Sequence, residues 1–221
     1  MIKLSKLKKP NVLDVSADTW TKTLVDKINS GVKPTDSEKT KYRHPDVKFA
    51  LVEETHGKCA YCESKLLHIH HGDVEHIYPK SLDPTKTFDW LNLTLACEIC
   101  NQLKSDSDPN MEFIIDPYNI EPAEHLNFVG TIVHAITADY GQSTKAILKL
   151  NRAALCERRR EKLEKTLSIF ENILNEKLSL PARKAIYEDL LENEGTSTSE
   201  FSAMNNAAIR NLQGQLDANF L

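Results

Sequence analysis

The sequence predicts an α+β fold that is mainly helical and includes one small ββα module held together by a metal ion. Two cysteine pairs, Cys59/Cys62 and Cys97/Cys100, each have two residues between their thiols, which is the spacing of a structural zinc site. Hydrophobic residues make up 40% of the 221 residues and glycine only seven, as in a helical protein with a core. We therefore expect three parts: an N-terminal helical segment at 1–58, the module at 59–108, and a mostly helical region at 109–221.

The N-terminal segment contains two stretches with apolar residues at helical spacing. The first is expected to form a helix from Asp18, a suitable N-cap, to Asn29, with Gly31 just beyond its end. The second is expected at 46–56, where it would lead the chain into the first cysteine pair. Residues 30–45 between them have the composition of a linker.

The module between the cysteine pairs is longer than a plain zinc ribbon, whose second spacing is about 15 to 20 residues. We expect two short strands at 66–69 and 73–77 joined by a turn, and then a loop at 81–87. A short helix from Glu98 would carry Asn101 and Lys104 on one face, because they are three residues apart. The predicted order is hairpin, loop and helix, with zinc at both ends.

The C-terminal region is expected to be mostly helical after a short β segment. Residues 128–136 predict a strand or hairpin broken near Gly130, and a second turn is expected at 140–141. A helix at 144–151 would lead into a long one, followed by a helix from Pro181 and a last one at 200–212. The long helix carries an apolar stripe that predicts a core face: Leu155, Leu163, Leu167, Phe170, Ile173 and Leu174.

Charge and cysteine usage restrict the setting in which the protein works. The net charge is −4, which is not the overall charge of a free-standing nucleic-acid binder. The run Arg158–Arg160 alternates with glutamates and predicts a solvated helix face. No apolar run suits a signal peptide or a membrane span, so we expect a cytoplasmic protein with no membrane contact and reduced thiols. Cys156, outside both pairs, is expected to be a small core residue.

Several polar residues of the module have the chemistry that phosphodiester hydrolysis requires. His76 could activate water, because imidazole titrates near neutral pH. Glu75 and Asn101 offer oxygen ligands to a hard divalent ion, and Asn92 could hydrogen-bond the backbone near His76. Lys80 and Lys104 are candidate phosphate contacts, although a solvated loop lysine remains an equal alternative for Lys80.

The order CxxC, VEHIYPKS, the NL of WLNL and ACEICNQLK resembles the zinc-stabilised form of the HNH endonuclease family. The resemblance implies a treble-clef-like fold with structural Zn²⁺ on the four cysteines. It also implies that His76 is the general base, that Asn92 orients the active-site loop, and that Glu75 and Asn101 hold a catalytic Mg²⁺ or another divalent ion. Many members have aspartate at the position of Glu75 and histidine at that of Asn101, which affects the choice of metal.

The flanking phrases narrow the resemblance. YRHPDVK and EETHGKCAYCES before the motif, and IDPYNIEPAEHLNF and LKLNRAALCERRRE after it, are similar to the HNH subunits of Septu and retron anti-phage defence systems. The resemblance implies an SMC/ABC-like ATPase partner, a nucleic-acid substrate (DNA or tRNA) and, in a retron, a reverse transcriptase with its msDNA. Self-association within the complex is a further expectation. The alternative from another class is a non-catalytic, zinc-dependent subunit that binds nucleic acid or protein.

Overall fold

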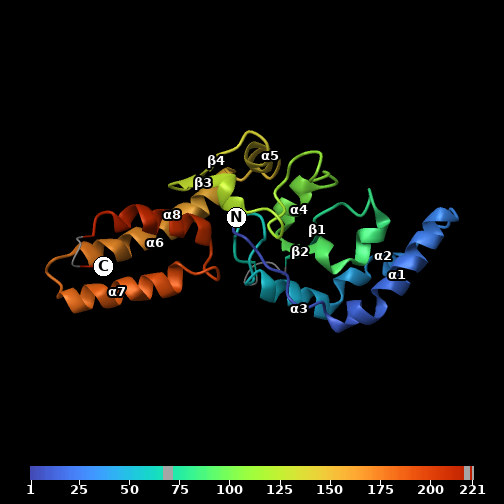
Figure 1. Ribbon diagram of the computed structural model, residues 1–221, viewed down its shortest axis with the longest axis horizontal. Helices are drawn as coiled ribbons and strands as arrows, with labels where there is room; N and C mark the ends of the chain where they lie inside the picture. The colour runs from blue at the N-terminus through green and yellow to red at the C-terminus, as the bar shows by residue number, and fades with distance from the viewer. Residues whose placement is uncertain (67–71, 217–219, 221) are drawn as a thin grey trace.

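The computed structural model describes residues 1–66, 72–216 and 220, which form an elongated molecule with two lobes (Figure 1). The helices of the described residues are α1 (Asn11–Asn29), α2 (Asp36–Lys39), α3 (Pro45–Glu54), α4 (Glu98–Lys104), α5 (Tyr140–Ile147), α6 (Ala153–Leu174), α7 (Leu180–Glu194) and α8 (Ser202–Gln213). Short 3-10 helices are η1 (Lys41–Arg43), η2 (Pro84–Phe88), η3 (Trp90–Asn92) and η4 (Pro122–Glu124). The strands are β1 (Asp73–His76), β2 (Leu93–Ala96), β3 (Leu126–Val129) and β4 (Ile132–Ala135).

Two antiparallel two-stranded sheets accompany these helices, so the predicted α+β class is confirmed. One lobe holds α1 to α4 with β1 and β2, and the other consists of α6, α7 and α8 (Figure 1). Among the described residues, no helix combines the length and the apolar character needed to cross a membrane.

The first helix of the N-terminal lobe begins earlier than the sequence predicts. Helix α1 starts at Asn11 and not at Asp18, because Pro10 stands before it with φ −58° and so fixes the entry of the chain into the helix. The expected linker at 30–45 contains α2 and η1, and a capping box between Thr35 and Glu38 stabilises α2. The predicted second helix is α3, which His44 caps by accepting a hydrogen bond at Nδ1 from the Asp46 amide.

The module contains a strand pairing that the sequence does not predict. β1 pairs with β2 in antiparallel register, with Glu75 opposite Thr94 and His76 opposite Leu93. The strand expected at 66–69 falls almost entirely on 67–71, which lie outside the described residues. β2 leads directly into Cys97, so its place beside β1 brings the second cysteine pair to the first. Its four residues are all buried, and a segment this short is at the lower limit of the length at which a sequence pattern identifies a strand.

The C-terminal half confirms the predicted hairpin at 128–136, where β3 and β4 meet at Gly130 with φ 58°. The turn expected at 140–141 is instead the start of α5, which Asp139 caps through its side chain. Helices α6, α7 and α8 share a second apolar core. Within the predicted stripe of α6, Phe170 and Ile173 are fully buried whereas Leu167 is exposed.

Two side chains of α6 differ from the sequence-based expectation. Arg159 was expected on a solvated face, yet it is 1% exposed and donates hydrogen bonds to the carbonyls of Leu150 and Thr131. Its neighbours Arg158 and Arg160 are exposed and paired with glutamates as predicted. Cys156 lies on the helix but is only half-buried.

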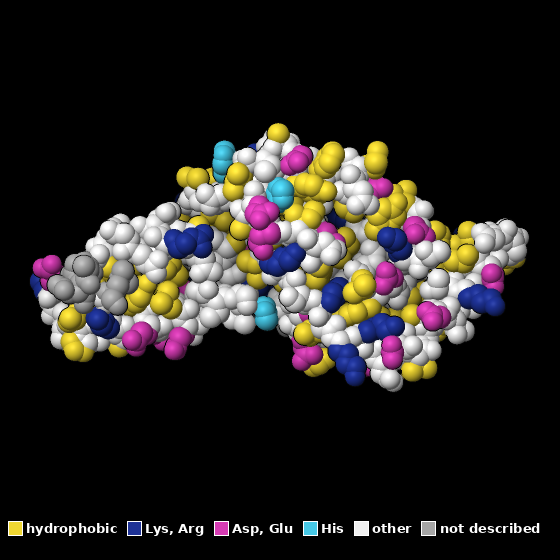
Figure 2. All heavy atoms as spheres, in the orientation of Figure 1, with side chains coloured by type: hydrophobic (Ala, Val, Ile, Leu, Met, Phe, Trp, Pro, Cys, Tyr) yellow, Lys and Arg dark blue, Asp and Glu magenta, His cyan; other side chains and the backbone are white. Residues whose placement is uncertain are grey.

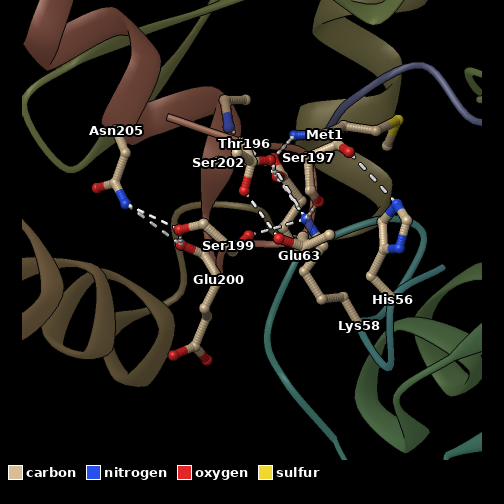
Figure 3. Close-up of polar contacts among 12 residues, drawn as sticks. Met1, His56, Lys58, Glu63, Thr196, Ser197, Ser199, Glu200, Ser202 and Asn205 are labelled. Carbon is tan, nitrogen blue, oxygen red and sulfur yellow. Dashed lines mark hydrogen bonds and ion pairs between the residues drawn. The ribbon is translucent and has the colours of Figure 1, made fainter. Parts of the chain in front are cut away.

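A buried polar cluster joins the first cysteine pair to the C-terminal segment (Figure 3). Lys58 Nζ donates to the carbonyls of Ser197 and Ser199 at 2.6 and 2.9 Å. The Glu63 carboxylate accepts from the Ser202 hydroxyl at 2.7 Å and pairs with the Met1 ammonium at 2.5 Å. Lys58 and Glu63 stand immediately before and after the pair Cys59/Cys62. We call Met1, Lys58, Glu63 and Ser202, with the two carbonyls, the Glu63 network.

Candidate functional site

The four cysteines of the two pairs converge on one point. Their Sγ atoms all lie within 4.8 Å of one another, and those of Cys62 and Cys97 are 3.8 Å apart. Tetrahedral zinc with Zn–S bonds of about 2.3 Å would place its sulfurs about 3.8 Å apart. Within the described part of the chain, no other cluster of three or more cysteine, histidine or acidic side chains could hold a metal ion. The donor set and its geometry therefore fit the predicted structural zinc.

Elements on both sides stabilise the zinc site. The Ala60 amide donates to the Leu95 carbonyl at 2.9 Å, which attaches the first cysteine pair to β2. Cys97 is the N-cap of α4, and its Sγ accepts from the Cys100 amide at 3.4 Å. Both terminal nitrogens of Arg152 lie 3.8 Å from Cys100 Sγ, so a cation faces the cluster of thiols. The four cysteines thus lie next to β2, at the start of α4 and beside Arg152, the N-cap of α6.

His76 ends β1 and is enclosed by two short helices. Its side chain is 4% exposed, its Nε2 is 3.0 Å from the Thr87 carbonyl of η2, and its ring meets the Tyr42 ring of η1 edge-on at 4.6 Å. A carbonyl oxygen can only accept a hydrogen bond, so Nε2 carries the proton and Nδ1 has the free lone pair. Burial, with a smaller contribution from Lys80, lowers the pKa of His76 to about 3. The imidazole is therefore neutral near pH 7, and its Nδ1 carries no proton.

Asn92 fixes the loop that follows β1. Its Oδ1 accepts from the Tyr78 amide at 2.7 Å, and its Nδ2 donates to the carbonyls of Tyr78 and Lys86 at 2.9 and 3.1 Å. The predicted hydrogen bonding of Asn92 to the backbone near His76 is thus present. Because Lys86 directly precedes Thr87, the same side chain also stabilises the segment whose carbonyl orients His76.

The opposite face of β1 meets α4 in two polar contacts. Asn101 Nδ2 donates to Asp73 Oδ2 at 3.0 Å, and Lys104 Nζ lies 3.0 Å from Glu75 Oε1. The spacing of two residues on the strand and three on the helix aligns the contacts side by side. The structure therefore brings Asn101 to Asp73, which lies two residues before Glu75 and so on the same face of β1.

Lys104 does not occupy the surface position expected of a phosphate contact. It is 1% exposed, and its ammonium donates to the His76 carbonyl at 2.9 Å as well as facing Glu75. Its placement on the buried face of α4 explains the difference, since the helical spacing that aligns it with Asn101 also turns it toward β1. Lys80, by contrast, is exposed near His76, with Nζ 5.5 Å from the centre of the Tyr42 ring.

Oxygen donors for a catalytic divalent ion are present between β1 and α4. Asp73, Glu75 and Asn101 offer carboxylate and amide oxygens, which hard ions such as Mg²⁺ prefer. Glu75 Oε1 is buried and accepts no well-directed hydrogen bond among the described residues, apart from its ion pair with Lys104. Burial raises the pKa of Glu75 despite the nearby ammonium. The Lys104 ammonium already supplies opposite charge to the buried Glu75 carboxylate, so an ion held by Asp73, Glu75 and Asn101 would share this carboxylate with it.

The sequence did not indicate two of the residues around His76. Tyr42 lies in the predicted linker, and Thr87 contributes its backbone carbonyl, which any residue type could supply. The phrase YRHPDVK, used above for the resemblance, was the available signal for Tyr42. A backbone acceptor leaves no trace in the residue type and could not have been found.

The segment that carries the four cysteines and His76 is similar to a known family. Residues 59–107 match the model of the HNH endonuclease family. The chain is also similar to Septu protein PtuB from Bacillus thuringiensis, with 31% identity over 137 residues, covering 58% of this chain and 53% of that protein. Similarity to Septu protein PtuB from Bacillus mycoides (strain KBAB4) is 25% over 150 residues, covering 53% and 51%.

These comparisons confirm the predicted resemblance to the zinc-stabilised HNH family and to the Septu proteins. The chain spans about half the length of the curated relatives it matches. The likeness to retron systems is not addressed by either relative and stays a prediction.

Proposed function

We propose that this protein is a metal-dependent endonuclease that hydrolyses phosphodiester bonds of nucleic acid, as the effector subunit of an anti-phage defence system. The observation that carries the proposal is the hydrogen bond between His76 Nε2 and the Thr87 carbonyl. It leaves Nδ1 of a neutral imidazole free to act as a base, within a segment that matches the HNH endonuclease family.

In this mechanism, His76 Nδ1 takes a proton from the attacking water, whose oxygen bonds to phosphorus as the bond from phosphorus to the 3′ oxygen breaks. The departing 3′ oxygen takes its proton from solvent. Asn92 holds the backbone at Tyr78 and at Lys86, which precedes the Thr87 carbonyl that contacts His76, and so keeps the imidazole in place. Asp73, Glu75 and Asn101 would hold Mg²⁺ or another divalent ion, which when bound neutralises charge on the phosphate and the departing oxygen. Lys104 orients Glu75 and the His76 carbonyl from behind the strand.

The proposed setting follows from the similarity to the two Septu proteins. An SMC/ABC-like ATPase of the same cytoplasmic system would be the partner. Figure 2 shows acidic and basic side chains interspersed over the visible face, in keeping with the net charge of −4. Such a surface attracts nucleic acid weakly, which supports delivery of the substrate by a partner. A retron reverse transcriptase and its msDNA belong to the same proposal for retron-borne homologues.

The test is cleavage of phage DNA and of bulk tRNA by the protein co-purified with its genomic neighbour. The wild type and His76→Ala are compared with Mg²⁺ and after its omission, and zinc content is measured in each sample. We expect cutting that requires both Mg²⁺ and His76. His134→Ala, which changes an exposed histidine of β4, is the matched control and should cut like the wild type.

Equal cutting by His76→Ala, or no cutting of either substrate, would favour the alternative. In that case the protein would be a zinc-dependent binding subunit, for which the low exposure of His76 is the supporting observation.

A further inference from the structure

Residues outside the matched segment 59–107 take part in the surroundings of His76. Tyr42 belongs to η1, is buried, and packs edge-on against the imidazole. Since η1 and η2 are also in contact, the pocket around His76 is built partly by the N-terminal region. The N-terminal region that precedes the module thus forms part of the surroundings of His76 and does more than support the module.

Two exposed cations share the ring of Tyr42. The guanidinium carbon of Arg43 lies 5.6 Å and the Lys80 ammonium 5.5 Å from the ring centre. Such distances are typical of cation–π contacts, which fix a charged group without neutralising it. The two cations come from different segments of the chain, η1 and the loop after β1, and the ring between them is the one that contacts His76.

Neither cation forms an ion pair with an acidic side chain in the part of the chain that the structure describes, although other exposed arginines do. Arg158 pairs with Glu161 at 2.7 Å, and Arg160 pairs with Glu157. An exposed cation that is held in place, and whose charge is not compensated by the protein, is suited to bind an anion from solution. The position beside His76 indicates which anion that is.

We propose that Arg43 and Lys80 form a phosphate-binding pair that holds the nucleic-acid backbone beside His76, with Tyr42 fixing both cations relative to the imidazole. This inference rests on the proposed function and adds the residues that bind the nucleic-acid strand. The pair would bind the phosphodiester groups that flank the scissile one, so its binding would be independent of base sequence. Guanidinium can bind a phosphate through two parallel hydrogen bonds, whereas the lysine acts as a point charge.

Geometry supports the placement. Both cations lie beside the Tyr42 ring that contacts the imidazole, so they create a positive potential next to His76. A phosphate bound between them would offset that positive potential. The same pair would thus attract the substrate and lie next to the group that takes the proton from the attacking water.

The test measures binding and not cleavage. Fluorescein-labelled single-stranded DNA, duplex DNA and RNA of equal length are titrated with the full chain in metal-free buffer, by fluorescence anisotropy over a range of salt concentrations. Arg43→Ala with Lys80→Ala should reduce the slope of log K against log salt by about 1.5, since each phosphate contact contributes about 0.7 to 0.9. Arg43→Lys with Lys80→Arg should retain the slope, because both charges remain.

The matched control removes the same charge elsewhere. Lys177→Ala with Arg210→Ala changes one exposed lysine and one exposed arginine of the other lobe, and its slope should equal that of the wild type. Thermal melting verifies that each double variant is folded. A wild-type slope in Arg43→Ala/Lys80→Ala, an equal loss in the control, or no binding of any probe by the wild type would overturn the phosphate-binding pair.

The two proposals fail separately. If cutting depends on His76 but the salt slope is unchanged in Arg43→Ala/Lys80→Ala, the proposed nuclease activity is retained and the proposed phosphate-binding pair is wrong. If the slope changes as expected but His76→Ala cuts like the wild type, the pair binds nucleic acid in a protein whose catalytic proposal is wrong.

Discussion

The ammonium of Lys104 lies 3.0 Å from Oε1 of Glu75, and both side chains are buried between α4 and β1. Removing one member of a buried ion pair leaves the other charge without a partner and costs about 3 to 5 kcal/mol. We therefore expect Lys104→Met to lower the free energy of unfolding by that amount in urea titrations. Lys104→Met combined with Glu75→Gln should recover part of the loss, and strict additivity of the two single changes would contradict the pairing.

Asn92 makes three backbone hydrogen bonds, one as acceptor and two as donor. Asn92→Ala should cost about 1 to 3 kcal/mol of stability through unpaired buried groups and should reduce single-turnover cleavage at least about tenfold, because the His76 loop loses its support. Asn92→Asp retains the acceptor but loses both donors, and we expect a similar loss of cutting. Asn110→Ala, an exposed asparagine, serves as the control. Normal cutting by Asn92→Asp would show that the donors are dispensable.

The pKa of His76 makes stability depend on pH. It is about 3 in the folded protein and about 6.5 in an unfolded chain, so the unfolded chain binds more protons between these values. The stability that neutral His76 contributes is full above pH 6.5 and is lost as the pH falls toward 3, at about 1.4 kcal/mol per pH unit. Urea unfolding from about pH 7 to pH 5 should therefore show a steeper loss for the wild type than for His76→Gln. Parallel curves would be inconsistent with a buried neutral imidazole.

The sequence was sufficient for the cluster of four cysteines, the helix that carries Asn101, and the strand that carries His76. It was not sufficient for the pairing of β1, because β2 is only four residues long and too short for its pattern to mark it clearly as a strand. The burial of Lys104 and Arg159 could not be predicted either, since a lysine or arginine on a helix is usually solvated. Their buried partners, the Glu75 carboxylate and the Leu150 carbonyl, are brought close only by the tertiary fold.

The zinc site should be necessary for folding of the module. Cys59→Ser removes one of four converging ligands, and metal binding in a small site is coupled to folding. We expect loss of zinc, measured by atomic spectroscopy, together with loss of the cooperative melting transition. Cys156→Ser, on α6 and outside the cluster, should keep its zinc and change stability by less than about 1 kcal/mol. A zinc-free Cys59→Ser protein with wild-type melting would refute the coupling.

Glu63 joins two cations and a hydroxyl in the Glu63 network (Figure 3). The neighbouring Met1 ammonium and Lys58 outweigh the effect of burial and lower the pKa of Glu63 to about 2. Glu63→Gln should thus destabilise the protein by about 3 kcal/mol at neutral pH, since it leaves Lys58 without its buried counter-charge. In the control Glu112→Gln, an exposed glutamate changes, and we expect less than about 0.5 kcal/mol. Equal effects would argue against the network.

The contacts of Lys58 and Glu63 with residues 197–203 span about 140 positions of the sequence. During synthesis, the residues that flank the first cysteine pair leave the ribosome long before their partners do. Lys58 and Glu63 therefore cannot form these contacts until the chain has been synthesised as far as α8. Contacts of such high sequence separation form late and slow the folding of a chain. The ββα module consequently reaches its final structure only when the C-terminal helices have been translated and these contacts have formed.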